Sequence, residues 1–150
     1  MAELFVEIFG KPHGIIVFQL LAACRFTIYL SLIAFIGGGA VACLITLFRI
    51  SKNSSLQRLA ASFIWIFQSV PLLMLLFLIG LGLPRLLDIN IDPWTAATFA
   101  LVLFTSAYLA EVWRGAVESV AKGQWEASFA LNMEYSLLLR KVIIPQALKF

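Results

Sequence analysis

The sequence predicts an all-α integral membrane protein, and two observations carry this prediction. First, 62% of the 150 residues are hydrophobic and 13% are charged, whereas soluble domains are roughly 45–50% apolar. A chain of this size has too small a core to bury that excess, so membrane lipid is the expected solvent and first partner. Second, the charges lie in short polar segments between apolar runs that are long enough to cross a bilayer.

Residues 1–22 are expected to form an outer, interfacial segment that precedes a transmembrane domain over residues 23–150. Glu3 and Glu7 stand where a secretory signal would need positive charge, so we expect no cleaved signal peptide. The imidazole of His13 suits the headgroup boundary, and a role in substrate access is the alternative.

The first predicted span covers residues 26–48. From Gly14 to Phe48 only Arg25 is charged, and this stretch is too long for one perpendicular span of about twenty residues. We therefore expect an interfacial lead-in that ends at Arg25, whose side chain can reach the outer headgroups. Inside the span, the run GGGA at Gly37–Ala40 lets another backbone approach closely, either for helix packing or as a hinge.

The polar segments set the predicted topology. Residues 49–58, RISKNSSLQR, carry three basic side chains and are expected in the cytoplasm under the positive-inside rule, which places the N-terminus outside. Spans are then expected over residues 59–83 and 95–117, and everything after Ser119 should be cytoplasmic. In the outer loop between these spans, Arg85 is expected to be balanced by two aspartates, and an aromatic residue marks the interface. These are Asp88, Asp92 and Trp94.

Polar residues at membrane depth in the second span mark part of a candidate translocation path. Pro71, within FQSVPLLM, removes a backbone donor and frees a carbonyl one turn earlier; Gln68 and Ser69 stand beside it. Broken helices at the midplane of transporters present such groups to solute. A packing kink satisfied by neighbouring helices is the alternative.

The third span contributes Ser106, Tyr108 and Glu111 to the same candidate path, because they fall within about one and a half helical turns. Arg114 follows Glu111 by three residues and can pair with it on one face. A carboxylate near the inner end of a membrane helix should face the bundle. This pair is either structural or part of the path.

Several function classes are excluded. Cys24 and Cys43 lie in one apolar run, and nineteen helical positions separate them by roughly 28 Å, too far for a disulfide. No His or Cys cluster predicts a metal, and no cofactor is expected. The net charge of +3 includes no basic block, so nucleic-acid binding is not expected. No nucleotide-binding signature or catalytic constellation is present, so the chain is not expected to be an enzyme.

The segment GQWEASFALNMEYSLLLRKVIIPQAL, residues 123–148, is predicted to be a helix, a tight turn and a second helix. Gly123 is expected to interrupt the preceding structure, which would put Glu126 in the first turn of the next helix, at the positive end of its dipole. The first helix should carry an apolar ridge with small residues beside it. The ridge residues recur every four positions: Trp125, Phe129 and Met133.

The turn in this segment is expected at Asn132, which tolerates the left-handed conformation that ends helices. A second helix over 134–141 and a new helix that begins around Pro145 should follow. The ridge with small flanking residues suits insertion into a cleft of a partner. The alternative is an amphipathic pair that lies on the membrane surface, although such pairs carry flanking basic residues and the acidic Glu126 and Glu134 are found here.

Residues 106–148 resemble the membrane permease subunit of bacterial ABC importers, in particular the polar amino acid branch. The resemblance rests on S-A-Y-x-x-E-x-x-R-G and on the EAA loop, expected over 119–145, in which Glu126 and Ala127 match. Ser128 replaces the second alanine, and Asn132 stands where glycine is usual. Earlier, QSVPLL resembles the family's R-G-T-P-L-L, matching from Pro71 onward. The similarity covers about residues 27–148.

The resemblance implies a function and partners. A cytoplasmic ATPase dimer would bind the EAA loop, hydrolyse ATP and switch the membrane helices between inward and outward access. A second permease subunit, the same chain or another, would complete the path, and an external binding protein would deliver the amino acid. The residues expected to couple to the ATPase are Gly123, Glu126, Ala127, Ser128, Leu131, Asn132 and Pro145.

Family members continue with about two more spans, so we expect that residues 1–150 do not transport alone. A membrane anchor that recruits a cytoplasmic protein without moving solute is the alternative function. The path residues should converge on a cavity in a permease and scatter in an anchor. Which amino acid is carried is not encoded in a charge pattern of this chain.

Overall fold

The computed structural model describes Gly10 and residues 13–149, and every regular element in that part of the chain is helical. The all-α prediction is therefore confirmed. Of the predicted outer segment 1–22, the structure describes Gly10 and the residues from His13 onward. Glu3 and Glu7 therefore lie outside the described residues. Two described helices are long and apolar enough to cross a membrane, and a bent pair of helices makes a third candidate.

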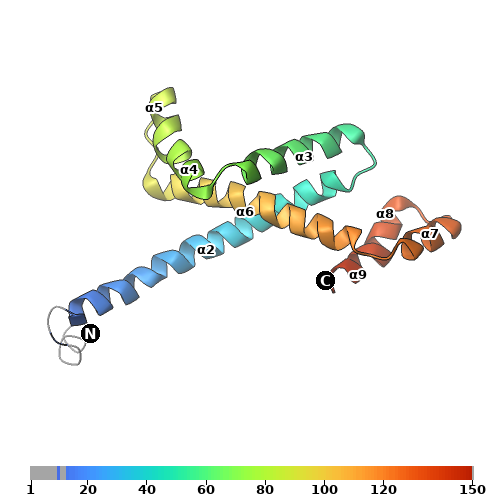
Figure 1. The fold of residues 1–150 in the computed structure, drawn as a ribbon, viewed down its shortest axis with the longest axis horizontal. Helices are drawn as coiled ribbons and strands as arrows, with labels where there is room; N and C mark the ends of the chain where they lie inside the picture. The colour runs from blue at the N-terminus through green and yellow to red at the C-terminus, as the bar shows by residue number, and fades with distance from the viewer. Residues whose placement is uncertain (1–9, 11–12, 150) are drawn as a thin grey trace.

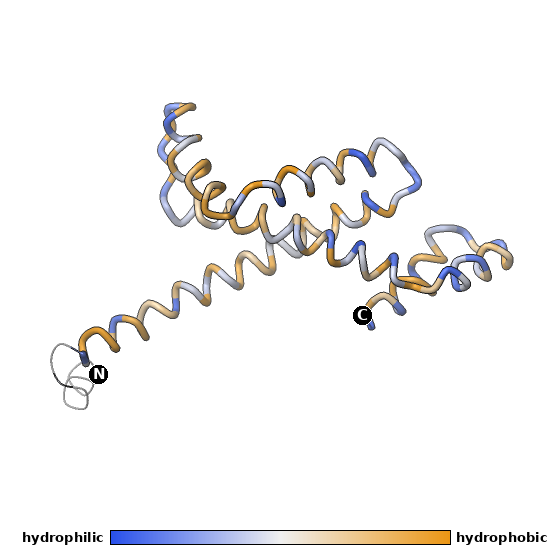
Figure 2. The backbone as a smooth tube through the Cα atoms, viewed as in Figure 1, coloured by the Kyte–Doolittle hydropathy of each residue, from blue (hydrophilic) through white to orange (hydrophobic). Residues whose placement is uncertain are grey.

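Helix α2, His13–Arg49, is one uninterrupted helix of 37 residues, so the expected division at Arg25 is not a break in the helix. No proline interrupts this stretch, and its mean hydropathy is high, although Figure 2 shows some hydrophilic turns along it. At about 1.5 Å per residue the helix is roughly 55 Å long, against about 30 Å of hydrocarbon. Its N-terminal part projects away from the other helices (Figure 1). Where the bilayer begins along it stays a prediction.

The predicted second span, residues 59–83, is not a single helix. Helix α3, Ser54–Ser69, and the helical run Leu72–Leu87 are bent by 98°. Val70 is extended, with φ −103° and ψ 125°, because the ring of a following proline disfavours the α conformation. The helix is thus broken at Pro71 rather than kinked, and exposure of these groups to solute stays a prediction. After α4, Leu72–Phe77, a π-helical turn leads into α5, Leu83–Leu87.

Helix α6, Pro93–Glu118, agrees with the predicted third span 95–117. It begins with Pro93 in its first turn, where a missing N–H costs nothing. Asp92 is its N-cap and accepts hydrogen bonds from the amides of Trp94 and Thr95 at 3.2 Å each. The carboxylate predicted to balance Arg85 therefore caps a helix.

Small residues on α2 form its contact with α6, and the two helices cross at this contact (Figure 1). A side chain on Gly38 would meet the Thr105 side chain at 2.9 Å and the Val102 carbonyl at 3.2 Å. Such spacing shows the backbones in close contact, which supports the packing alternative for the glycine run over the hinge. The buried residues on this side of α2 recur every four positions: Ala34, Gly38, Ala42 and Thr46.

The C-terminal segment folds as a helix, a tight turn and a second helical run, as predicted. Helix α7 is Lys122–Ala130, α8 is Tyr135–Leu138 and α9 is Ile144–Ala147, with a π-helical turn at Leu139–Ile143 between α8 and α9. We call residues 122–147 the coupling segment. It lies at the end of α6 opposite to α5 (Figure 1).

Two details of this segment differ from the prediction. Helix α7 begins at Lys122, so Gly123 lies inside its first turn and not before it. Glu126 therefore lies beyond the first turn. Helix α9 does not start as a separate helix at Pro145 but continues the run from Tyr135. The π turn makes this possible, because it widens the backbone just ahead of a ring that would clash with a regular helical carbonyl. Pro84 follows the π turn Leu78–Gly82 in the same way.

Candidate functional site

The coupling segment has its own apolar core at the end of α6. The fully buried Leu138 and Ile143 pack there with the buried Val117 and Val120 of the α6 end. Trp125 and Met133 contact this core from outside. Phe129, by contrast, is 52% exposed. The predicted ridge is thus divided, since Trp125 and Met133 contact the core and Phe129 does not. Met133 does not continue the ridge along α7, because the helix ends at Ala130.

Most of the predicted coupling residues are exposed. Glu126 and Phe129 are three positions apart on α7 and so share one of its faces. Leu131, in the turn, is 77% exposed. We define the docking face as the exposed residues from position 126 to the turn: Glu126, Ala127, Phe129, Ala130, Leu131 and Asn132. Gly123 and Pro145 are also exposed.

Ser128 is the exception among the predicted coupling residues. It is 4% exposed, and its hydroxyl donates to the Gln124 carbonyl at 2.7 Å within α7. Its small size therefore serves the packing of α7 on the core, and its side chain does not belong to the docking face.

Backbone hydrogen bonds fix the turn that ends α7. Asn132 has φ 52°, the left-handed conformation predicted for it. The Met133 amide donates to the Ser128 carbonyl at 3.1 Å, and the Asn132 amide to the Phe129 carbonyl at 2.9 Å. This closure satisfies carbonyls that a helix end leaves free. It holds Leu131 outward at the tip of the segment.

The second half of the coupling segment is attached to the loop that follows α2, which the sequence analysis did not predict. The Tyr135 hydroxyl donates to the Ile50 carbonyl at 2.5 Å, and the Lys52 ammonium lies 4.8 Å from the Tyr135 ring centroid. We call this pair of interactions the Tyr135 contact. Burial raises the pKa of the Tyr135 hydroxyl, so it stays protonated and remains a donor at neutral pH. No local pattern could reveal a contact across 85 positions.

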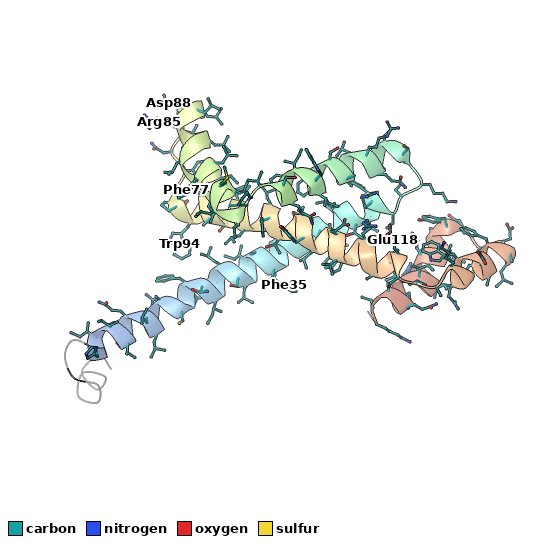
Figure 3. The ribbon with its side chains drawn as sticks, viewed as in Figure 1. Phe35, Phe77, Arg85, Asp88, Trp94 and Glu118 are labelled. Atoms are coloured by element: carbon teal, nitrogen blue, oxygen red, sulfur yellow. The ribbon has the colours of Figure 1, made fainter. Side chains whose placement is uncertain are left out.

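The predicted pair of Glu111 and Arg114 forms and extends to a third charge. Arg114 donates to both carboxylate oxygens of Glu111, at 2.6 and 3.0 Å, and also pairs with Glu118. Glu118 lies where α6 approaches the coupling segment (Figure 3). Two-point pairing of a guanidinium with a carboxylate is strong and geometrically specific, so it stiffens the C-terminal end of α6.

Among the candidate path residues of the second span, Gln68 contacts the third span. The Gln68 side-chain amide donates to the Ala107 carbonyl of α6 at 3.4 Å, next to the buried Ser106. The hydroxyls of Ser69 and Ser106 bond to carbonyls of their own helices, at 2.6 and 2.7 Å. Tyr108 is 44% exposed, and Pro71 is exposed at the break.

Three cavities lie elsewhere. One of about 550 Å³ opens between α2 and α6, one of about 270 Å³ lies among α2, α6 and α9, and one of about 460 Å³ lies beside Tyr135. Their linings include none of the path candidates. A convergent path through Gln68, Ser69 and Tyr108 therefore stays a prediction.

The end of α6 opposite to the coupling segment carries the aromatic and charged residues expected at an interface. The Phe26 and Trp94 rings lie 5.3 Å apart, and the Arg25 guanidinium lies 4.7 Å from the Phe26 ring centroid. Arg85 and Asp88 lie at the far tip of α5 (Figure 3). Arg25 and Trp94 thus occupy one level of the bundle, as expected for groups at one interface.

Residues 34–150 match a family described as "Binding-protein-dependent transport system inner membrane component". The chain belongs to this family. The family predicted from residues 106–148 is therefore confirmed. The EAA loop predicted over residues 119–145 falls within the matched residues and stays a prediction.

Curated relatives of this chain are named as permease proteins. The nopaline transport system permease protein of Agrobacterium fabrum is 35% identical over 98% of this chain and 61% of its own length. A probable amino-acid ABC transporter permease protein of Bacillus subtilis is 35% identical over 83% of this chain and 54% of its own length. The chain thus spans about three fifths or less of these relatives.

Two solved structures resemble the fold. The crystal structure of an amino acid ABC transporter with histidines has a TM-score of 0.81 at 33% identity, covering 91% of this chain and 64% of that one. An inward-facing methionine ABC transporter, MetNI, has a TM-score of 0.63 at 24% identity and covers 92% and 65%, respectively. The first match supports the amino acid branch, and the second supports the fold.

Proposed function

We propose that this chain is a permease subunit of an ATP-driven ABC importer of polar amino acids. The observation that carries the proposal is the exposed docking face on a helix–turn–helix whose sequence carries the family's EAA loop. The relatives named as permeases favour this function over a membrane anchor. The chain adds no catalytic step of its own, and ATP is hydrolysed by a partner subunit.

The partners follow from this function. A cytoplasmic ATPase dimer contacts the docking face, where Phe129 and Leu131 offer apolar area beside the charge of Glu126. A second permease subunit, identical or different, completes the membrane path, and an external binding protein delivers the amino acid. The chain crosses the plasma membrane several times with its N-terminus outside. Gln68, Ser69, Pro71, Ser106, Tyr108 and Glu111 contribute to the path.

Transport requires that the ATPase bind the docking face differently in two states, because equal binding shifts no equilibrium. The coupling segment suits this role. Its core attaches it firmly to the end of α6, so a displacement of the docking face is carried into a membrane helix. The paired charges of Glu111, Arg114 and Glu118 stiffen that end of α6.

The test is capture of the transport system's own ATPase subunit by this chain in lipid nanodiscs. Leu131→Asp places a charge at the tip of the docking face and is expected to abolish capture, because an interface centre tolerates no unpaired charge. Leu86→Asp is the matched control: Leu86 is 79% exposed and Leu131 is 77% exposed, and Leu86 lies in α5 at the other end of the molecule. Equal capture by both variants would contradict the proposal.

A further inference from the structure

The Tyr135 contact caps the end of α2. Ile50 is the first residue after α2, and the last carbonyls of a helix have no partner within it. The Tyr135 hydroxyl satisfies the Ile50 carbonyl at 2.5 Å. A side chain of the coupling segment thus completes a membrane helix that is distant in sequence.

The same residue holds the loop at a second point. The Lys52 ammonium lies 4.8 Å from the centre of the Tyr135 ring, a distance at which a cation is attracted to the ring face. The ring itself is half-buried against the core of the coupling segment. Tyr135 is therefore fixed on one side by packing and attached to the loop by its hydroxyl and its ring.

The loop that receives this contact is stiff. The Asn53 side chain accepts from the Ser55 amide at 2.9 Å and caps α3. The Gln57 side-chain amide donates to the Ser51 carbonyl at 2.6 Å across the loop. A displacement of Ile50 is therefore carried through Ser51 to the start of α3 instead of being absorbed by the loop.

The coupling segment is also stiff on its own side. Leu138 and Ile143 are fully buried in its core, and the Gln146 side chain bonds to the Gln124 side chain at 3.2 Å, which ties α9 to α7. The docking face and Tyr135 therefore belong to one unit. The backbone joins this unit to α6 through residues 119–121, and Tyr135 joins it to α2 and α3.

We propose that Tyr135 is a positioning residue that transmits displacement of the coupling segment to the ends of α2 and α3. The proposal rests on the proposed function, because it assigns a route for motion that an ATPase imposes on the docking face. Without the Tyr135 hydroxyl, that motion reaches α6 directly but reaches α2 and α3 only through helix packing. The residue touches neither solute nor nucleotide and acts through the loop.

Hydrogen–deuterium exchange of the whole chain in lipid nanodiscs tests the contact itself. Tyr135→Phe keeps the ring and its packing and removes only the hydroxyl. It is expected to speed exchange across residues 50–57 by about tenfold, as loss of one hydrogen bond predicts. The reporters include the Ile50 and Ser51 amides, which donate to the Thr46 and Phe48 carbonyls.

Tyr29→Phe is the matched control, because Tyr29 is 59% exposed in the middle of α2. It removes the same hydroxyl and is expected to leave exchange across residues 50–57 unchanged. Unaltered exchange of α6 in both variants shows that the fold is retained. If Tyr135→Phe exchanges across 50–57 like the unchanged chain, the contact is overturned.

Addition of the system's ATPase subunit tests transmission. In the unchanged chain the ATPase is expected to slow exchange both in α7 and across residues 50–57. In Tyr135→Phe it should still slow exchange in α7 but lose most of its effect across 50–57. Equal slowing at 50–57 in both chains overturns the positioning role. If the unchanged chain fails to capture the ATPase, the proposed function and the positioning role are both overturned. Hydrogen–deuterium exchange of the chain without ATPase still tests whether the Tyr135 contact forms.

Discussion

The contact between α2 and α6 and the core of the coupling segment are built from different side chains. In the first, Ala34, Gly38 and Ala42 bring two backbones together. In the second, Val117, Leu138 and Ile143 fill an apolar core. The surrounding solvent explains the difference. Lipid is as apolar as leucine, so membrane helices associate by close packing, whereas a segment in water is stabilised by burial of large apolar groups.

The largest expected effect concerns the core of the coupling segment. Leu138→Ala removes a fully buried side chain and should lower the free energy of unfolding of the coupling segment by about 2–5 kcal/mol. Leu137→Ala is the matched control, because the neighbouring Leu137 is 45% exposed. Limited proteolysis of residues 119–147 in nanodiscs reads out local unfolding. Equal susceptibility of the two variants would contradict an apolar core in this segment.

The next largest effect concerns the membrane contact. Gly38→Ala puts a methyl group 2.9 Å from the Thr105 side chain and 3.2 Å from a backbone carbonyl, and such overpacking costs about 1–3 kcal/mol. At Gly39 the nearest atom, on Trp113, would be 3.9 Å away, so Gly39→Ala should be neutral or slightly stabilising. Unfolding by denaturing detergent measures both. If Gly38→Ala left the free energy of unfolding unchanged, α2 and α6 would be able to move apart at no cost to accommodate the methyl group.

The comparison also explains how far the sequence predicted the fold. The apolar runs predicted the long helices, and Pro71 marked the site of the break. The angle of 98° could not be predicted, because it depends on where the helices after the break pack. Leu75 and Ile79 there contact Ala96 and Ala100 of α6.

The candidate site was also predicted only in part, because some of its contacts depend on tertiary packing. Asn132 and the exposed Leu131 follow from local conformation and from the family motif. The four-residue spacing of Trp125, Phe129 and Met133 predicted one ridge. However, α7 ends before Met133, and both Trp125 and Met133 pack against the core. The Tyr135 contact depends entirely on the tertiary fold.

A smaller effect is expected at the surface of the coupling segment. Glu126→Lys changes an exposed residue and should alter stability by less than about 0.5 kcal/mol. It reverses a charge on the docking face, so capture of the ATPase should weaken by about tenfold. Glu134→Lys, which makes the same charge change at an exposed position outside the docking face, is the control. Unchanged capture by Glu126→Lys would remove this residue from the docking face.

The smallest effect belongs to the N-terminal end of α6 and depends on pH. Hydrogen bonds from Thr95 lower the pKa of Asp92, so folding favours its charged form. This stabilisation is complete above the unfolded pKa of about 3.9 and is lost as the pH falls through the lower folded pKa. Asparagine also caps helices but does not titrate. Asp92→Asn should therefore be slightly less stable than the unchanged chain at pH 7, and the difference should disappear once the pH lies below the folded pKa of Asp92. Asp88→Asn, a change in the same loop at a residue that does not cap α6, controls for the lost charge. Because Asp92 is exposed, an effect as large as that of Gly38→Ala would show that the N-terminal end of α6, and not only its contact with α2, controls the stability of the membrane part.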